Sequence, residues 1–326
     1  MKGLMSSRVY GSILALCAVL SFSLCARAQT YPSKPIHIII PFGAGSSTDQ
    51  LARALAQSIT EETGQPVVIE TKPGANGYLG VQAVANAAPD GYTVLFGSSA
   101  THGINQFLFR NIPYDPVKDF SPVTPLSRGA FIFAVNSKSP VKTIQEFLDL
   151  ARKNPGRISL ATGTPGTRLA GELFQQITGA HLLPVPYKAI PAAITDLLGG
   201  QVEMTIADGG NLLAMVKTGR LRALGVSGVN RWESLPEAPT LREAGVTGYD
   251  STYWTAAWLP ANSPAAVVAR LNQLLTNATR APAATRFFAA SAIEAFTMLP
   301  EEFAKFQISQ AQEMGRLIKA AGIKPE

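Results

Sequence analysis

Short apolar strands alternate with amphipathic helices along most of this chain, and this alternation limits the possible folds more than any other feature. The apolar run Ile36–Ile40 is followed by a loop of small residues and then by a helix with Leu51 and Leu55 on its apolar face. The same order recurs up to a final helix, predicted at about 300–321. Strands that alternate with helices indicate an α/β fold with a mainly parallel sheet.

A second unit with the same pattern begins near Ala130. Its first strand is predicted over Phe131–Val135, and a later strand rich in aromatic residues is predicted over Thr252–Leu259. The chain of 326 residues is long enough for two domains of ordinary size.

Three loops rich in Gly, Ser and Thr lie directly after predicted strands and before helices: Gly43–Asp49, Gly97–Thr101 and Thr162–Thr167. Ligands of open α/β sheets bind outside the carboxyl ends of strands. Helix N-termini there offer unpaired N–H groups and a partial positive charge. Each loop alone is better explained by helix capping, for which Ser, Thr and Asp are preferred. Three such loops together favour a site for a carboxylate or a phosphate.

Asp49 has two interpretations. An acid in the first turn of a helix is stabilised by the helix dipole, which requires no ligand. Alternatively, its carboxylate braces the preceding loop by accepting hydrogen bonds from the loop's N–H groups.

The first residues have the pattern of an export signal. Lys2 and Arg8 are followed by the apolar run Val9–Leu24 and by the small-x-small sequence Ala26-Arg27-Ala28. We expect residues 1–28 to be a signal peptide, cut after Ala28, and the product to be periplasmic. A membrane anchor is a weaker alternative because the run is short and contains Ser and Gly. Lipid attachment at Cys25 is also weaker because a bulky Leu precedes it.

Removal of the signal changes the chemistry of the chain. Both cysteines, Cys17 and Cys25, leave with it, which excludes a disulfide, a cysteine nucleophile and a cysteine metal site. Lys2, Arg8 and Arg27 leave as well, so the formal net charge falls from +6 to +3. This modest excess, without a cluster of Lys and Arg, argues against nucleic acid as a partner.

Catalytic patterns are weak in the rest of the chain. Of the three histidines, only His102 lies in a loop where it could touch a ligand. The sequence Gly43–Gly45 follows a strand, but the third Gly of a dinucleotide fingerprint is replaced by Thr48. Lys188 follows a strand end and is more simply a solvated lysine than a nucleophile. We therefore expect no catalytic residue, no cofactor and no metal.

The motifs taken together resemble one family, the tripartite tricarboxylate transporter receptors, also called the Bug family of periplasmic solute-binding proteins. The resemblance covers essentially all of the chain after the signal. The matching stretches are Tyr31–Ile36, Pro41–Arg53, Lys72–Gly77, Ala88–Thr93, Leu169–Phe174, Val185–Lys188, Asp196–Glu203, Gly219–Gly228, Leu235–Gly245 and Gly248–Trp254.

The resemblance implies a two-domain, periplasmic-binding-protein-like fold of type II, a Venus flytrap with the ligand cleft between two α/β domains. It places domain one at 30–130 plus 255–326 and domain two at 131–254. It also implies ligand-binding residues on four segments. These are Phe42, Gly43, Ala44, Gly45, Ser46, Ser47 and Asp49; Ser98, Ser99 and Thr101; Thr162, Gly163, Thr164, Thr167 and Arg168; and Asp208.

The chain departs from the family pattern at several positions. Ser46 replaces a Gly, Asn76 interrupts a glycine loop, and Ala189 stands where Gly is common after Tyr-Lys. Arg168 stands where His is common. Its guanidinium either grips a second acid group of the ligand or points to solvent and pairs with an acid such as Glu172. The two interpretations are equally supported.

The resemblance implies a receptor without enzymatic activity. We expect it to capture a small organic carboxylate and deliver it to a membrane carrier with large and small subunits, as a monomer. A sensor that presents the bound carboxylate to a signalling protein is the alternative, and an exported enzyme on the same fold is a third. The identity of the carboxylate stays open.

Overall fold

The computed structural model describes residues 31–326, so the predicted signal peptide, residues 1–28, lies outside the described residues. All elements below belong to one compact unit, Lys34–Glu326. The strands are β1 (Ile36–Ile40), β2 (Val67–Thr71), β3 (Thr93–Ser98), β4 (Phe120–Asn136), β5 (Ser159–Thr162), β6 (Leu183–Pro186), β7 (Met204–Asp208), β8 (Leu221–Val226), β9 (Thr252–Pro260) and β10 (Glu294–Ala295).

Helices follow most of the strands. The α-helices are α2 (Ser47–Thr63), α3 (Tyr78–Ala85), α4 (Asn105–Leu108), α5 (Ile144–Lys153), α6 (Pro165–Thr178), α7 (Ile190–Gly199), α8 (Gly209–Lys217), α9 (Ala265–Thr279), α10 (Pro282–Ser291) and α11 (Pro300–Ala320). Two short helical turns, η2 (Ala75–Gly77) and η3 (Ala100–Ile104), precede α3 and α4. Among residues 31–326, none of the helices is both long and apolar enough to cross a membrane.

The sheet is mixed, so the prediction of a mainly parallel sheet holds only at its two ends. The strand order is β2-β1-β3-β9-β4-β7-β5-β6, with β8 and β10 also paired to β4. β1 is parallel to β2 and β3, and β5 is parallel to β6 and β7. The central strands β9 and β4 pair antiparallel with each other and with their neighbours.

Strand β4 is longer than predicted and joins the two parallel ends. Its first part, from Phe120 to Ala130, pairs with β9, and its second part, from Phe131 to Val135, pairs with β7. Two register shifts interrupt the first part next to Pro122 and Pro125. Because proline cannot donate a ladder hydrogen bond, it is tolerated in strands at such irregularities. The predicted strand Phe131–Val135 is therefore only the second part of β4.

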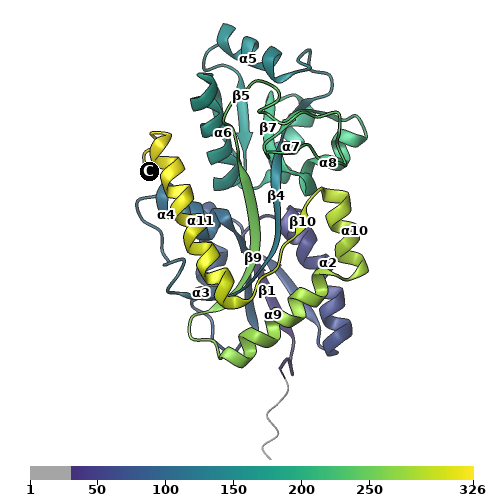
Figure 1. Cartoon of the computed structure of the whole chain (residues 1–326), viewed down its shortest axis with the longest axis vertical. Helices are drawn as coiled ribbons and strands as arrows, with labels where there is room; N and C mark the ends of the chain where they lie inside the picture. The colour runs from purple at the N-terminus through teal and green to yellow at the C-terminus, as the bar shows by residue number, and fades with distance from the viewer. Residues whose placement is uncertain (1–30) are drawn as a thin grey trace, which may run out of the picture. The chain divides into compact units, whose positions relative to one another are not determined.

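Different helices pack around the two ends of the sheet (Figure 1). Helices α5 to α8 surround β5 and β7, and helices α2, α3, α9 and α11 lie around β1 and β9. The buried side chains form an apolar cluster at each end. Ile132, Ala161 and Leu212 belong to one cluster, and Trp258 and Phe303 belong to the other.

Candidate functional site

A cavity of about 360 Å³ opens where the loops after several strands meet. This volume lies within the range of small-molecule sites. Most of the predicted site residues line it. They are Phe42, Gly43, Ser46, Ser47, Ser98, Ser99, Thr162, Gly163, Thr164, Thr167, Arg168 and Asp208. Four predicted residues do not line it: Ala44, Gly45, Asp49 and Thr101.

The loop between β1 and α2 forms one wall, and Asp49 braces it from behind. The Gly45 N–H donates to Asp49 Oδ2 at 2.8 Å, and Asp49 Oδ1 pairs with Arg53 Nη2 at 3.0 Å. Ser46 is the N-cap of α2. The bracing role that the sequence suggested for Asp49 is confirmed, and this engagement places its carboxylate outside the cavity. Ala44 and Gly45 lie at the exposed outer turn of the loop.

The start of α6 forms the opposite wall through a compact capping network. Thr167 Oγ1 accepts hydrogen bonds from the N–H groups of Gly163 and Thr164 at 3.2 and 3.1 Å. Thr164 Oγ1 accepts from the Thr167 N–H at 3.2 Å. The first-turn residues Ser47 and Gly166 of α2 and α6 both line the cavity. First-turn N–H groups have no partner within their own helix, so these two helix ends can receive an anion.

Thr101 and His102 turn away from the cavity. Thr101 Oγ1 donates to the Ser98 carbonyl at 3.0 Å, and the His102 ring stacks on Trp258 with 3.8 Å between ring centroids. His102 is fully buried, and this burial lowers its pKa to about 3. The expectation that His102 could touch a ligand is therefore wrong for this geometry: its loop coils into η3, which carries the ring into the aromatic core.

Asp208 lies on the cavity wall at the N-terminus of α8. Its Oδ1 accepts hydrogen bonds from the Asn211 N–H at 3.1 Å and from Asn211 Nδ2 at 2.8 Å. Burial nevertheless raises the pKa of the Asp208 carboxyl, with hydrogen bonds from Asn211 and Ser47 opposing the shift. Tyr253, which also lines the cavity, has its pKa raised by burial and by the Asp208 charge. The wall therefore offers a carboxyl group that takes up a proton more readily than an ordinary aspartate.

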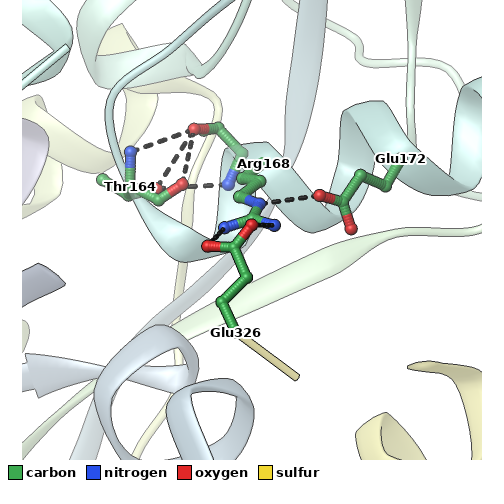
Figure 2. A network of polar contacts seen from close by, with 5 residues as sticks. Thr164, Arg168, Glu172 and Glu326 are labelled. Carbon is green, nitrogen blue, oxygen red and sulfur yellow. Dashed lines mark hydrogen bonds and ion pairs between the residues drawn. The ribbon is translucent and has the colours of Figure 1, made fainter. Parts of the chain in front are cut away.

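Arg168 is engaged by two acids (Figure 2). Its Nε donates to Glu172 Oε1 at 2.7 Å. Its Nη1 and Nη2 donate to Glu326 Oε2 and Oε1 at 2.8 and 2.7 Å. The pKa of Arg168 is raised, chiefly by the hydrogen bond to Glu326. Of the two interpretations of Arg168, pairing with Glu172 is the one seen, and the distant Glu326 was not foreseen.

Several lining residues were not predicted. Four of them, Thr48, Ala100, Pro165 and Gly166, lie within the three predicted loops without having been named as site residues; the others are Pro41, Gly74–Gly77, Phe131, Pro186–Ile190, Asn211, Tyr253 and Thr255. Two sequence signals could have found some of them, namely the glycine loop Lys72–Gly77 and the Val185–Lys188 motif. Lys188 is an exposed cation at the edge of this lining, and no ion pair joins it to another of the residues 31–326.

The loops from opposite walls touch at Gly43 and Ala189. A Cβ placed on Gly43 would lie only 2.6 Å from the Ala189 Cβ. A Cβ on Gly163 would lie 2.6 Å from the backbone nitrogen of Ile190. Glycine at both positions thus permits the β1–α2 and β5–α6 loops to approach the start of α7.

Histidine, cysteine and acidic side chains do not gather into groups of three or more that could hold a metal within residues 31–326. The chemistry that this lining offers is the binding of an anion by helix N-termini, hydroxyl groups and one lysine.

Comparisons with known proteins identify the family of this chain. Residues 51–323 match the tripartite tricarboxylate transporter family receptor, TctC. A UPF0065 protein of Bordetella bronchiseptica is 35% identical over 306 residues, which cover 92% of this chain and 89% of that protein.

Solved structures are similar over most of the chain. The periplasmic binding protein BugD superposes with a TM-score of 0.87 at 30% identity, covering 91% of this chain and all of that one. A Rhodopseudomonas palustris protein with adipate gives 0.87 at 29%, with 91% and 100% covered. MatC from Rhodopseudomonas palustris with bound malate gives 0.82 at 26%, with 88% and 100% covered. The predicted fold, that of periplasmic binding proteins, is confirmed, and the chain belongs to the tripartite tricarboxylate transporter receptor family.

Proposed function

We propose that this protein is a periplasmic receptor that captures a small organic dicarboxylate in the cavity between the α2 and α6 N-termini. One observation carries the proposal: two helix N-termini, several hydroxyl groups and the unpaired Lys188 line one cavity of about 360 Å³. The related structures with adipate and malate support the ligand class, because both molecules are dicarboxylates.

The charges of the lining favour a dicarboxylic acid whose two carboxylates lie in different surroundings. One carboxylate meets the helix N-termini of α2 and α6, and Lys188 supplies a positive charge for the other. Asp208 lies in the same lining, and its raised pKa allows it to donate a hydrogen bond when protonated.

The cavity draws residues from both predicted domains, 30–130 plus 255–326 and 131–254. Closure of these domains would bury the ligand and offer a distinct surface to a membrane carrier with large and small subunits. Removal of residues 1–28 after Ala28 would release the receptor into the periplasm. The receptor would act as a monomer and would carry its ligand without transforming it.

We expect malate or adipate to raise the melting temperature of the mature protein by about 5 °C when present at about 100 times its dissociation constant. Such an excess stabilises the folded state by about 2.7 kcal/mol, and each kcal/mol shifts the melting temperature by a few degrees in a chain of this size. Differential scanning fluorimetry across a panel of dicarboxylates is the measurement. Hexanoate is the matched control for adipate, because it has the same length and one carboxylate. If no acid in the panel stabilises the protein, the proposal is wrong.

Replacement of Lys188 by Met should weaken dicarboxylate binding on the order of tenfold at low salt, because the lining loses its unpaired positive charge. Hexanoate binding should change less. Lys138→Met is the control, since Lys138 lies outside the cavity lining. Isothermal titration at low and at high salt is the measurement, and equal affinities of the Lys188 and Lys138 variants would remove Lys188 from the site.

A further inference from the structure

The pair of Arg168 and Glu326 joins two segments that are 158 positions apart in sequence. The guanidinium of Arg168 donates two parallel hydrogen bonds to the Glu326 carboxylate, at 2.8 and 2.7 Å. Figure 2 shows the two planar groups facing each other, with Glu172 on the Nε side. Bidentate pairs of this kind are stronger and more directional than single ion pairs.

Glu326 is held at its backbone to a different part of the molecule than Arg168. Its N–H donates to the Leu108 carbonyl at 3.0 Å, and its carbonyl accepts from the Arg110 N–H at 2.8 Å. Leu108 is the last residue of α4. Arg168, in contrast, lies in the first turn of α6, which directly follows β5. The ion pair therefore links the residues after α4, in predicted domain one, to the start of α6, in predicted domain two.

A second hydrogen bond links α6 to the same final segment of the chain. Gln176 Nε2, two turns along α6 from Arg168, donates to the Ala320 carbonyl at the end of α11 at 3.1 Å. α6 is thus tied at two places to the final segment, residues 320–326. The first of these ties lies beside the ligand loop, because Arg168 itself lines the cavity and follows the capped turn Thr164–Thr167.

Neither the charge of Arg168 at the start of α6 nor the stability of the fold explains the ion pair with Glu326. An arginine in the first turn of a helix is disfavoured by the helix dipole, but Glu172 at i+4 already supplies a neutralising carboxylate. The Glu326 side chain is 61% exposed, so its pair adds little to the stability of the fold. A second, bidentate carboxylate from a remote segment is more useful for fixing the position of α6 relative to α4.

We propose that Glu326 is a latch: by gripping Arg168 it holds the two predicted domains in the described arrangement, with or without ligand, and slows the release of a bound ligand. Glu326 acts through Arg168 and is a positioning residue, since it does not line the cavity. The proposal rests on the proposed function only for its effect on ligand release.

Whether loss of Glu326 weakens or strengthens ligand binding distinguishes the latch from an alternative role. If Arg168 were instead a ligand-binding group masked by Glu326, the Glu326 carboxylate would compete with the ligand. Loss of Glu326 would then strengthen binding. A latch predicts the opposite, which is weaker binding through faster release.

The test uses Glu326→Gln in the mature full chain, with Glu313→Gln as the matched control. Glu313 also pairs with an arginine, Arg316, but both lie on α11, so this pair joins nothing across the cavity. With adipate or malate as the probe, Glu326→Gln should raise the release rate about threefold to tenfold by stopped-flow fluorescence. The effect should vanish in an Arg168→Gln background. Tighter or unchanged binding, or an effect that persists without Arg168, would overturn the latch.

A ligand-free measurement keeps the latch testable if neither probe binds, an outcome that would count against the proposed function alone. Small-angle scattering should give a larger radius of gyration for Glu326→Gln than for Glu313→Gln. Amide hydrogen exchange should be faster across Gly163–Arg168 in the first variant only. Identical scattering and exchange in the two variants would contradict the latch.

Discussion

Gly43→Ala should weaken dicarboxylate binding by about 10-fold to 100-fold. The added methyl group would fall 2.6 Å from the Ala189 Cβ, which is closer than two carbon atoms can approach. Relief requires the β1–α2 loop to move away from the start of α7, and both segments line the cavity. Overpacking of this kind typically costs about 1–3 kcal/mol, and every 1.4 kcal/mol is a factor of ten in affinity.

A second substitution, at Ala189, should restore the binding that Gly43→Ala weakens. Ala189→Gly removes the opposing methyl group, and Ala189 makes no side-chain capping bond at the start of α7. Glycine is accepted at such an N-cap position at least as well as alanine. The double variant should therefore bind like the unmodified protein, and Ala189→Gly alone should bind within about threefold of it. Isothermal titration of the four proteins forms a double-mutant cycle. Additive effects in that cycle would show that the Gly43–Ala189 contact does not control the cavity.

The contact between Gly43 and Ala189 could not be predicted from the sequence. The substitution at Ala189 was visible as a departure from the family pattern, but its meaning depends on which loop lies opposite. That neighbour is Gly43, which lies far earlier in the chain. Because capping depends on residues three or four positions apart, local patterns predicted side-chain capping in the three hydroxyl-rich loops, and it is present at Ser46 and Thr164 but not at Ser99. A contact between loops of different segments has no such local signature.

The sheet likewise contains strands that the local sequence predicts and one, β4, whose length it does not. The strands β1, β3, β5 and β7 could be predicted because each is a short apolar run bounded by turn residues. The full length of β4 could not, since Pro122 and Pro125 are typical of turns and are retained only because bulges against β9 accommodate them. Consequently the sequence suggested a boundary near Ala130 where one strand in fact continues.

Only one of the two acidic partners of Arg168 could be predicted from the sequence. The i+4 partner Glu172 could be predicted from helix geometry alone. Glu326 could not, because only the folded chain brings the residues after α11 next to α6. Lys188 is exposed, as predicted for a lysine at a strand end, but only the position of β6 and α7 places it in the lining.

The unfolding free energy should fall as the pH is lowered from about 6.5 toward 3, at up to about 1.4 kcal/mol per pH unit, because of His102. Burial lowers the pKa of this ring from 6.5 to about 3 in the folded protein. Below pH 6.5 the unfolded chain therefore binds a proton that the folded protein cannot, which favours unfolding. Above this pH both states are neutral at this position, so the contribution no longer changes. The full loss at acidic pH is on the order of 5 kcal/mol.

His102→Phe tests this assignment because it keeps an aromatic ring against Trp258 and Phe120 while removing the titrating group. Thr101 Oγ1 retains its bond to the Ser98 carbonyl, so the loop keeps its main polar anchor. Urea unfolding of both proteins between about pH 7.5 and 4.5 gives two slopes, and the comparison is independent of any change in absolute stability. The slope of the unfolding free energy against pH should be smaller for His102→Phe by about 1.4 kcal/mol per pH unit, which corresponds to one proton. His102→Gln, which is also unable to titrate, should show the same reduction, and parallel profiles for all three proteins would mean that His102 takes up its proton in the folded state as readily as in the unfolded chain.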